Sequence, residues 1–197
     1  LQPHMKSWPT DGTMDWLWPA AERLNIPIAL LAGEFLPLLG EKARQHPGLK
    51  LIVDHMGTVR NTKGAEAFAT MPELVALAKY PNVAVKATAG PLYATDGYPF
   101  KSLTPWYRQM FDAFGPKRMF WGTDITRMPC SWRQCIDHVH AAMPWLSPAD
   151  KEQVMGRAVC DWLGWKRPAS PLFPRRRVFA GELRGEGTVQ ALLAMLQ

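Results

Sequence analysis

Four short apolar segments, spaced along the chain, constrain its fold more than any other feature of the sequence. They cover residues 26–33, 49–55, 83–88 and 119–124. Each is long and apolar enough for a strand buried on both faces, and a helical pattern separates each from the next. Strands that alternate with helices form a parallel sheet with right-handed crossovers. The sequence therefore predicts an α/β fold.

Polar residues stand at or just beyond the carboxyl ends of these strands: Glu34, His55, Lys86 and Asp124. Single polar residues at many strand ends are typical of a (β/α) barrel, whereas a doubly wound sheet usually carries a glycine-rich phosphate loop. The sequence has neither a Gly-x-Gly-x-x-Gly nor a Walker motif, so we expect no nucleotide cofactor. A complete barrel has eight strands, of which this chain would supply four.

Helical periodicity and ordinary start and stop signals place helices between the strands. The expected helices cover residues 14–24, 36–45, 104–114, 132–142 and 147–163. Ser147 should cap the last helix and Gly164 should end it. Thr70 and Glu73 form the pattern of a capping box, and residues 89–103 are expected to be a long loop. Four tryptophans are expected in the core: Trp16, Trp18, Trp121 and Trp162.

The positive charge of the chain is concentrated at one end. Residues 166–197 contain six lysines and arginines against two acidic residues, so most of the net charge of +6 lies there. We therefore expect a nearly neutral domain over residues 1–165, followed by a poorly ordered Pro/Arg-rich tail over residues 166–197 with a short terminal helix. A nucleic-acid partner is not expected, because the charge does not belong to the main domain.

The sequence also bears on membranes and on redox state. No apolar run approaches the roughly 18 residues that cross a bilayer, and residues 1–4 do not resemble a signal peptide. We therefore expect no membrane partner. The three cysteines, Cys130, Cys135 and Cys160, are an odd set without a Cys-x-x-Cys pair. This favours reduced thiols and a cytoplasmic protein over a disulfide framework or a structural zinc site.

Asp124 and His55 are the strongest candidates for chemistry. A carboxylate that ends an apolar strand can act as a general base or bind a divalent cation, although it can also cap a loop or pair with Arg127. A strand-end histidine can bind metal, shuttle a proton or polarise a carbonyl, or be structural. Asp54 should point to the opposite side by strand alternation, as a supporting carboxylate.

Lys86 and Arg127 are candidates for holding an anionic substrate group. An arginine suits a carboxylate particularly well, because its guanidinium can donate two parallel hydrogen bonds. The alternative for both residues is ordinary ion pairing. On either interpretation, we expect them near Asp124 and His55 at the carboxyl edge of the sheet.

Three segments resemble the amidohydrolase-related metal-dependent hydrolases (amidohydrolase family 2). Residues 46–57, with the sequence HPGLKLIVDHMG, resemble the sixth strand of that family, residues 80–86 the seventh and residues 114–124 the eighth. The resemblance covers about residues 1–165 and is closest to the branch that contains 2-pyrone-4,6-dicarboxylate lactonase. It implies that the chain is the carboxyl half, strands 5–8, of a (β/α)8 TIM barrel.

The resemblance also implies a reaction. Asp124 would activate water for attack on an ester, lactone or amide carbonyl of a small, carboxylated molecule, while His55 helps polarise that carbonyl. A zinc-type divalent ion is common in the family and would here be held by His55 and Asp124. The family's first-strand His-x-His pair is absent, since His138 and His140 have only its spacing and fall in a predicted helix.

Two alternatives remain open. Related enzymes are lyases that decarboxylate acids with the same strand-end residues. The chain could also be a truncated, inactive half-barrel, whose exposed strand edges favour a homo-oligomer or association with a missing amino-terminal half. We expect the isolated chain to be catalytically silent or nearly so.

Overall fold

A four-stranded parallel sheet forms the centre of the structure, a computed structural model that describes residues 7–31 and 33–166. The strands are β1 (Ile28–Leu30), β2 (Leu51–Val53), β3 (Val83–Thr88) and β4 (Met119–Gly122), and they lie side by side in chain order. All three pairings are parallel. This confirms the predicted α/β fold with four consecutive strand–helix units.

Helices and short helical turns connect the strands and follow the last one. The α-helices are α1 (Leu17–Arg23), α2 (Leu36–Gln45), α3 (Gly64–Ala67), α4 (Met71–Ala76), α5 (Gly90–Tyr93), α6 (Thr104–Phe114), α7 (Trp132–Ala142), α8 (Pro148–Glu152) and α9 (Ala158–Leu163). The short turns are η2 (Gly33–Phe35), η3 (Asp54–Gly57), η4 (Leu77–Lys79), η5 (Lys101–Leu103), η6 (Ile125–Arg127) and η7 (Gln153–Arg157), the last of which is a π-helical turn.

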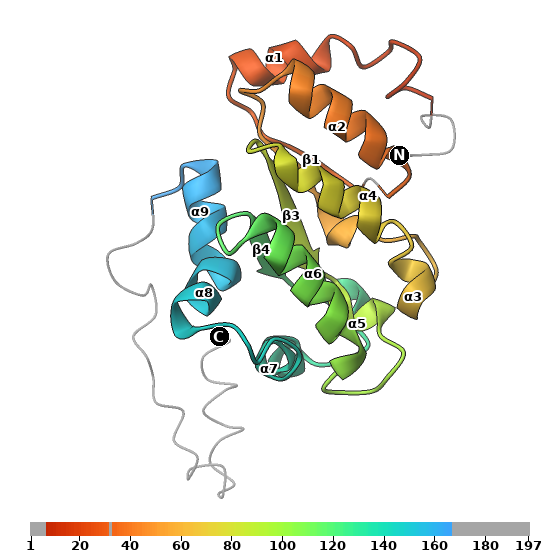
Figure 1. Cartoon of the computed structure of the whole chain (residues 1–197), viewed down its shortest axis with the longest axis vertical. Coiled ribbons are helices and arrows are strands. Elements are labelled where there is room, and N and C mark those ends of the chain that lie inside the picture. The colour runs from red at the N-terminus through yellow and green to blue at the C-terminus, as the bar shows by residue number, and fades with distance from the viewer. Residues whose placement is uncertain (1–6, 32, 167–197) are drawn as a thin grey trace, which may run out of the picture. The chain divides into compact units, whose positions relative to one another are not determined.

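The two faces of the sheet are buried against different helices. Side chains alternate along a strand, so Leu51 and Val53 on β2 face one way and Ile52 faces the other. Leu51 and Val53 belong to the large core shared with α2, α4 and α6, whereas Ile52 joins a small cluster with Phe120 and residues of α9. Figure 1 shows α4 and α6 in front of the sheet and α9 beside β4. Within the described residues, α9 thus covers the second face.

The amino ends of β3 and β4 are fixed by polar side chains that bind backbone carbonyls. The Asn82 amide donates to the carbonyls of Ala43, His46 and Leu49 at 3.1, 3.0 and 2.9 Å. The Arg118 guanidinium donates to three further carbonyls, those of Tyr80, Val83 and Ala78, at 2.9, 3.0 and 3.0 Å. Partial burial lowers the pKa of Arg118. These two residues satisfy carbonyls of the connections that precede β2 and β3, and that of Val83, the first residue of β3.

Several local predictions are confirmed and others are wrong. Ser147 caps α8, and Gly164 has the left-handed backbone (φ 71°) expected after α9. Thr70 makes no capping box, because its hydroxyl donates to the Gly57 carbonyl at 2.7 Å instead. Trp16, which immediately precedes α1, is 69% exposed, so its predicted place in the core is wrong. Trp18 is buried as predicted.

Two predicted segments are more divided than the sequence indicated. The long loop at residues 89–103 contains α5 and η5. The helix expected over residues 147–163 is interrupted by the π-helical turn η7. Among residues 7–31 and 33–166, no helix is long and apolar enough to span a bilayer. The tail and terminal helix predicted after residue 166 lie outside the described residues.

Candidate active site at the carboxyl edge of the sheet

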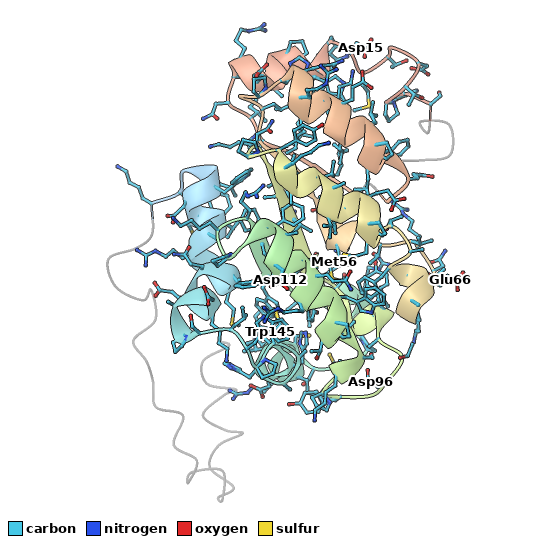
Figure 2. The ribbon with its side chains drawn as sticks, viewed as in Figure 1. Asp15, Met56, Glu66, Asp96, Asp112 and Trp145 are labelled. Carbon is cyan, nitrogen blue, oxygen red and sulfur yellow. The ribbon has the colours of Figure 1, made fainter. Side chains whose placement is uncertain are left out.

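Left-handed backbone positions both candidate catalytic residues. His55, Met56 and Gly57, directly after β2, have φ angles of 47°, 60° and 61°, and Asp124, after β4, has φ 56°. Such angles are uncommon for residues other than glycine and persist where the surrounding structure imposes them. Met56 is 1% exposed and fixes the first turn in the core, where Figure 2 labels it. Both strands therefore end in strained turns that set the direction of His55 and Asp124.

Thr88, at the end of β3, orients the His55 ring. Its hydroxyl oxygen lies 2.7 Å from His55 Nδ1 in a partly buried hydrogen bond. Thr88 is in register with Gly122 on β4, and a Cβ atom at Gly122 would come within 2.8 Å of Thr88 Cγ2. A glycine at position 122 therefore leaves the space in which Thr88 holds His55.

The other nitrogen of His55 faces Asp124. His55 Nε2 lies 3.7 Å from Asp124 Oδ2, and Arg127 Nη1 lies 3.8 Å from the same oxygen. These distances exceed a direct hydrogen bond and lie within the range of an ion pair, so the Asp124 carboxylate is not held by a short hydrogen bond to either group. The carboxylate thus lies between an imidazole and a guanidinium, where it can accept a proton from a water molecule.

His55 is kept neutral by its surroundings. Partial burial is the largest effect and lowers its pKa, with smaller contributions in the same direction from Arg127 and Lys86. Asp124 and Asp54 act in the opposite direction but do not outweigh burial. A neutral imidazole has one N–H donor and one free nitrogen. Since Thr88 occupies Nδ1, the Nε2 atom is the one that meets a substrate or a metal.

Asp54 and Lys86 form a close ion pair at the same edge. Lys86 Nζ lies 2.7 Å from Asp54 Oδ1, and both residues line one cavity with His55. The prediction that Asp54 and His55 point to opposite sides is therefore wrong, because β2 ends at Val53 and the left-handed turn interrupts the alternation. For Lys86, the structure thus shows the alternative to substrate binding that the sequence left open, an ordinary ion pair.

The cavity at this edge has a volume of about 440 Å³. His55, Lys86, Thr88 and Asp124 line it, and Val159 of α9 closes part of its wall. This volume is sufficient for a small organic molecule. The polar residues at the ends of β2, β3 and β4 thus share one cavity, with Arg127 beside Asp124.

Zinc or a similar ion would find two of its ligands here. His55 Nε2 and Asp124 Oδ2 are of the right chemical type and face one another, whereas protein zinc sites use three or four protein ligands. Within residues 7–31 and 33–166, no group of three or more His, Cys, Asp or Glu side chains is arranged to hold a metal. The described residues therefore fit part of a metal site and do not complete one.

The remaining predicted polar residues lie elsewhere. Glu34 is exposed and lines a different cavity, of about 460 Å³, with Arg60 and residues of the turn after β2. His138 is 2% exposed, and its Nε2 accepts from the Tyr107 hydroxyl at 3.2 Å. His140 Nδ1 lies 3.3 Å from Lys151 Nζ on the surface. The His138–His140 spacing therefore has no part in this site.

Apart from residues of β4 and the turn after it, Thr88 and Val159 line the cavity without having been predicted from the sequence. Thr88 could have been found, because it follows Lys86 by two positions and strand alternation puts both on the same face. Val159 carried no signal, since its position depends on α9 packing against the second face of the sheet. The position of Thr88 thus follows from its own strand, whereas the position of Val159 depends on tertiary packing.

Comparison with known proteins gives a family and a curated relative. The sequence profile of the Amidohydrolase family matches residues 1–171. An L-fucono-1,5-lactonase from Burkholderia ambifaria is 29% identical over 158 residues, which are 72% of this chain and 50% of the lactonase. The chain therefore spans half the length of that relative.

Solved structures give the same fold. A zinc-bound amidohydrolase from Burkholderia multivorans superposes with a TM-score of 0.70 at 19% identity, over 81% of this chain and 60% of that one. A structure described as a putative 2-pyrone-4,6-dicarboxylic acid hydrolase from Pseudomonas putida gives 0.58 at 20% identity, over 77% and 56%. At this level of identity the likeness shows the fold alone.

Proposed function

Because the chain belongs to the amidohydrolase family, we propose that it supplies the Asp124–His55 edge of a lactone-hydrolysing site. The observation that carries this proposal is the approach of Asp124 Oδ2 to within 3.7 Å of His55 Nε2 across one cavity. The matched protein from Burkholderia ambifaria is an L-fucono-1,5-lactonase, and this supports a lactone as the substrate class.

Asp124 is the general base in this proposal. Its Oδ2 accepts a proton from a water molecule, and the water oxygen attacks the lactone carbonyl carbon to form a tetrahedral intermediate. Arg127, near the same oxygen, keeps a positive charge beside the carboxylate. Collapse of the intermediate breaks the bond to the ring oxygen, which leaves as a hydroxyl after receiving the proton from Asp124.

His55 polarises the carbonyl. With the Thr88 hydroxyl donating to Nδ1, the neutral ring carries its proton on Nε2 and donates it to the carbonyl oxygen as negative charge develops there. A low pKa suits this role, because the ring keeps a single, oriented N–H donor at neutral pH. A zinc-type ion would use the other tautomer of His55, with Nδ1–H donating to Thr88, and Asp124 would be its second ligand; when bound, it would polarise the carbonyl as a Lewis acid in place of the Nε2–H donor.

Arg127 is the better of the two candidates for a substrate carboxylate. Lys86 is already neutralised by Asp54 at 2.7 Å, whereas the side chain of Arg127 is 47% exposed and 3.8 Å from its nearest carboxylate oxygen. Arg127 therefore has donors available for an incoming anion. A carboxylated or hydroxylated lactone is the substrate class that this arrangement suits.

A second polypeptide segment completes the site in this proposal. Strands β1 and β4 are the edges of the described sheet, and each is paired on one side only. Among the described residues, His55 and Asp124 are the two candidate metal ligands at this edge. An edge strand pairs readily with further strands. The missing ligands and strands come from an amino-terminal half or from a second copy, and the chain by itself is inactive or nearly so.

A chimaera with the matched lactonase tests this function. The 158-residue segment of the Burkholderia ambifaria enzyme would be replaced by the matching part of this chain. Turnover would be followed with L-fucono-1,5-lactone and 2-pyrone-4,6-dicarboxylate, with the isolated chain in parallel. We expect turnover by the chimaera, at least a hundredfold loss with Asp124→Asn, and little change with the control Asp112→Asn on the surface of α6.

Three outcomes would overturn parts of the proposal. A folded chimaera without turnover, or with turnover that survives Asp124→Asn, would contradict the role of the Asp124 edge. Turnover by the isolated chain would contradict the need for a second segment. Release of carbon dioxide without ring hydrolysis would assign the site to a lyase instead.

A further inference from the structure

Two cysteine sulfurs lie in contact beyond the candidate active site. Cys130 Sγ and Cys135 Sγ are 3.6 Å apart. Cys130 belongs to the loop after η6 and is partly exposed, whereas Cys135 lies in the first turns of α7 and is 1% exposed. This pair could not be expected from the sequence, because five positions separate the two residues and they do not form a Cys-x-x-Cys motif.

A capping box brings the two thiols together. Ser131 Oγ accepts from the Gln134 backbone N–H at 3.3 Å, and Gln134 Oε1 accepts from the Ser131 N–H at 3.0 Å. These reciprocal bonds fix the turn between the loop and the helix. Cys130 therefore folds back over the first turn of α7, against the side chain of Cys135.

We propose that Cys130 and Cys135 are a reversible dithiol–disulfide site, which takes a low-molecular-weight disulfide as its oxidant. A disulfide bond has an S–S distance near 2.05 Å, so the two sulfurs need to approach by about 1.5 Å. Cys130 lies in the loop before α7 rather than in the helix, and rotation of its side chain can bring the sulfurs closer. This inference does not depend on the catalytic proposal.

The exchange proceeds in two balanced steps. The Cys130 thiolate attacks one sulfur of the small disulfide, whose S–S bond breaks and releases one thiolate. The Cys135 thiolate then attacks Cys130 Sγ and releases the second small thiol. The two cysteine protons end on the two released thiols. The protein dithiol is oxidised by two electrons, and the small disulfide is reduced by the same two.

The exposure of the two cysteines decides which sulfur reacts first, and the burial of Cys130 decides how fast exchange occurs. Cys130 is the partner that a solute can reach, and Cys135 is the one that resolves the mixed disulfide. Burial and the neighbouring Cys135 thiol raise the pKa of Cys130 to about 11. Little thiolate therefore exists at neutral pH, so exchange is slow and the equilibrium, rather than the rate, is the quantity to measure.

Oxidation would also tether the loop that follows Asp124. The Arg127 N–H donates to the Asp124 carbonyl at 3.0 Å, and the Met128 N–H donates to the Ile125 carbonyl at 3.2 Å. Cys130 comes two residues after this hydrogen-bonded turn. A Cys130–Cys135 bond would attach the far end of that turn covalently to α7.

The test is a redox equilibrium of the full chain in glutathione buffers. Thiols would be quenched with N-ethylmaleimide, and the species separated by intact mass and peptide mapping. We expect a Cys130–Cys135 disulfide, with an equilibrium constant at least tenfold higher in the folded chain than in urea. The control Cys160→Ser should leave that constant unchanged, and Cys130→Ser should abolish the intramolecular disulfide.

A variant of the capping box tests whether the folded structure, rather than the short separation in sequence, brings the two cysteines together. Gln134→Ala keeps both thiols and removes one of the two reciprocal bonds, so the equilibrium constant of the folded chain should fall several-fold. Equal constants in the folded and unfolded chain would overturn the proposal. A disulfide that involves Cys160, or persistent glutathione on Cys130 without closure, would overturn it as well.

Discussion

The two edges of the sheet use polar side chains in opposite ways. At the amino edge, Asn82 and Arg118 donate to six backbone carbonyls at 2.9 to 3.1 Å. At the carboxyl edge, His55 and Asp124 stand 3.7 Å apart on left-handed backbone. The first arrangement consumes hydrogen-bonding capacity inside the protein, and the second leaves it available to a ligand. Stability and chemistry are thus separated along the strands, as in complete barrels.

We expect the largest change in stability from a mutation at the amino edge. Asn82→Ala removes the donor shared by three carbonyls and should lower the free energy of unfolding by about 2–4 kcal/mol. The control Gln45→Ala removes an amide that donates to Glu41 on the surface of α2 and should cost less than about 0.5 kcal/mol. Urea denaturation measures both. A loss at Asn82 no larger than at Gln45 would break the comparison.

The carboxyl edge should respond in the opposite direction. Asp124→Gly places a glycine where φ is 56° and should leave stability unchanged or raise it by up to about 1 kcal/mol, because glycine adopts this backbone without strain. The control Asp112→Gly, on α6 in Figure 2, should cost about 1 kcal/mol, since it puts glycine in a helix and removes the bond from Arg108. Thermal unfolding compares them. A clear loss with Asp124→Gly would show that Asp124 is structural.

The smallest effect concerns a charged contact on the amino side of β2. Glu22 lies 2.9 Å from His46 and accepts from the Gly48 N–H at 2.8 Å. The hydrogen bond with His46, followed by that from Gly48, lowers the pKa of Glu22. A depressed carboxyl pKa stabilises the fold above the unfolded-state value, near 4.5, and this contribution disappears as the pH falls through the lower folded-state value.

Glu22→Gln should therefore destabilise the chain modestly at pH 6 and have a smaller effect near pH 3. The control Glu66→Gln changes an exposed glutamate of α3 and should show no such dependence. Denaturation midpoints across this pH range measure the difference. An effect of Glu22→Gln that is constant with pH would mean that its charge does not contribute.

Much of the fold could be predicted because its signals are local. The strands appear as apolar runs, and Ser147 and Gly164 mark helix ends through contacts within a few residues. The prediction that Trp16 is buried was wrong for a related reason, because helical periodicity indicated a helix from residue 14 whereas α1 begins at Leu17. The predicted Thr70–Glu73 capping box was wrong because the Thr70 hydroxyl donates instead to the Gly57 carbonyl, thirteen residues earlier.

The candidate site was only partly accessible from the sequence. His55, Lys86, Asp124 and Arg127 were expected at one edge, and the structure places them there. The ion pair between Asp54 and Lys86 was not expected for Asp54, because strand alternation was assumed to continue past Val53. The roles of these residues remain predictions that the chimaera tests.

The sequence by itself determined the order of the strands, the polar residues that follow them and the family of the chain, because hydrophobic runs and motifs are written in consecutive residues. Only the tertiary structure decided the left-handed turns at His55 and Asp124, the space at Gly122 for Thr88, and the contact of Cys130 with Cys135. Each of these depends on which side chains crowd a given backbone from distant parts of the chain or from a neighbouring turn. Packing between elements, rather than local preference, fixes such features.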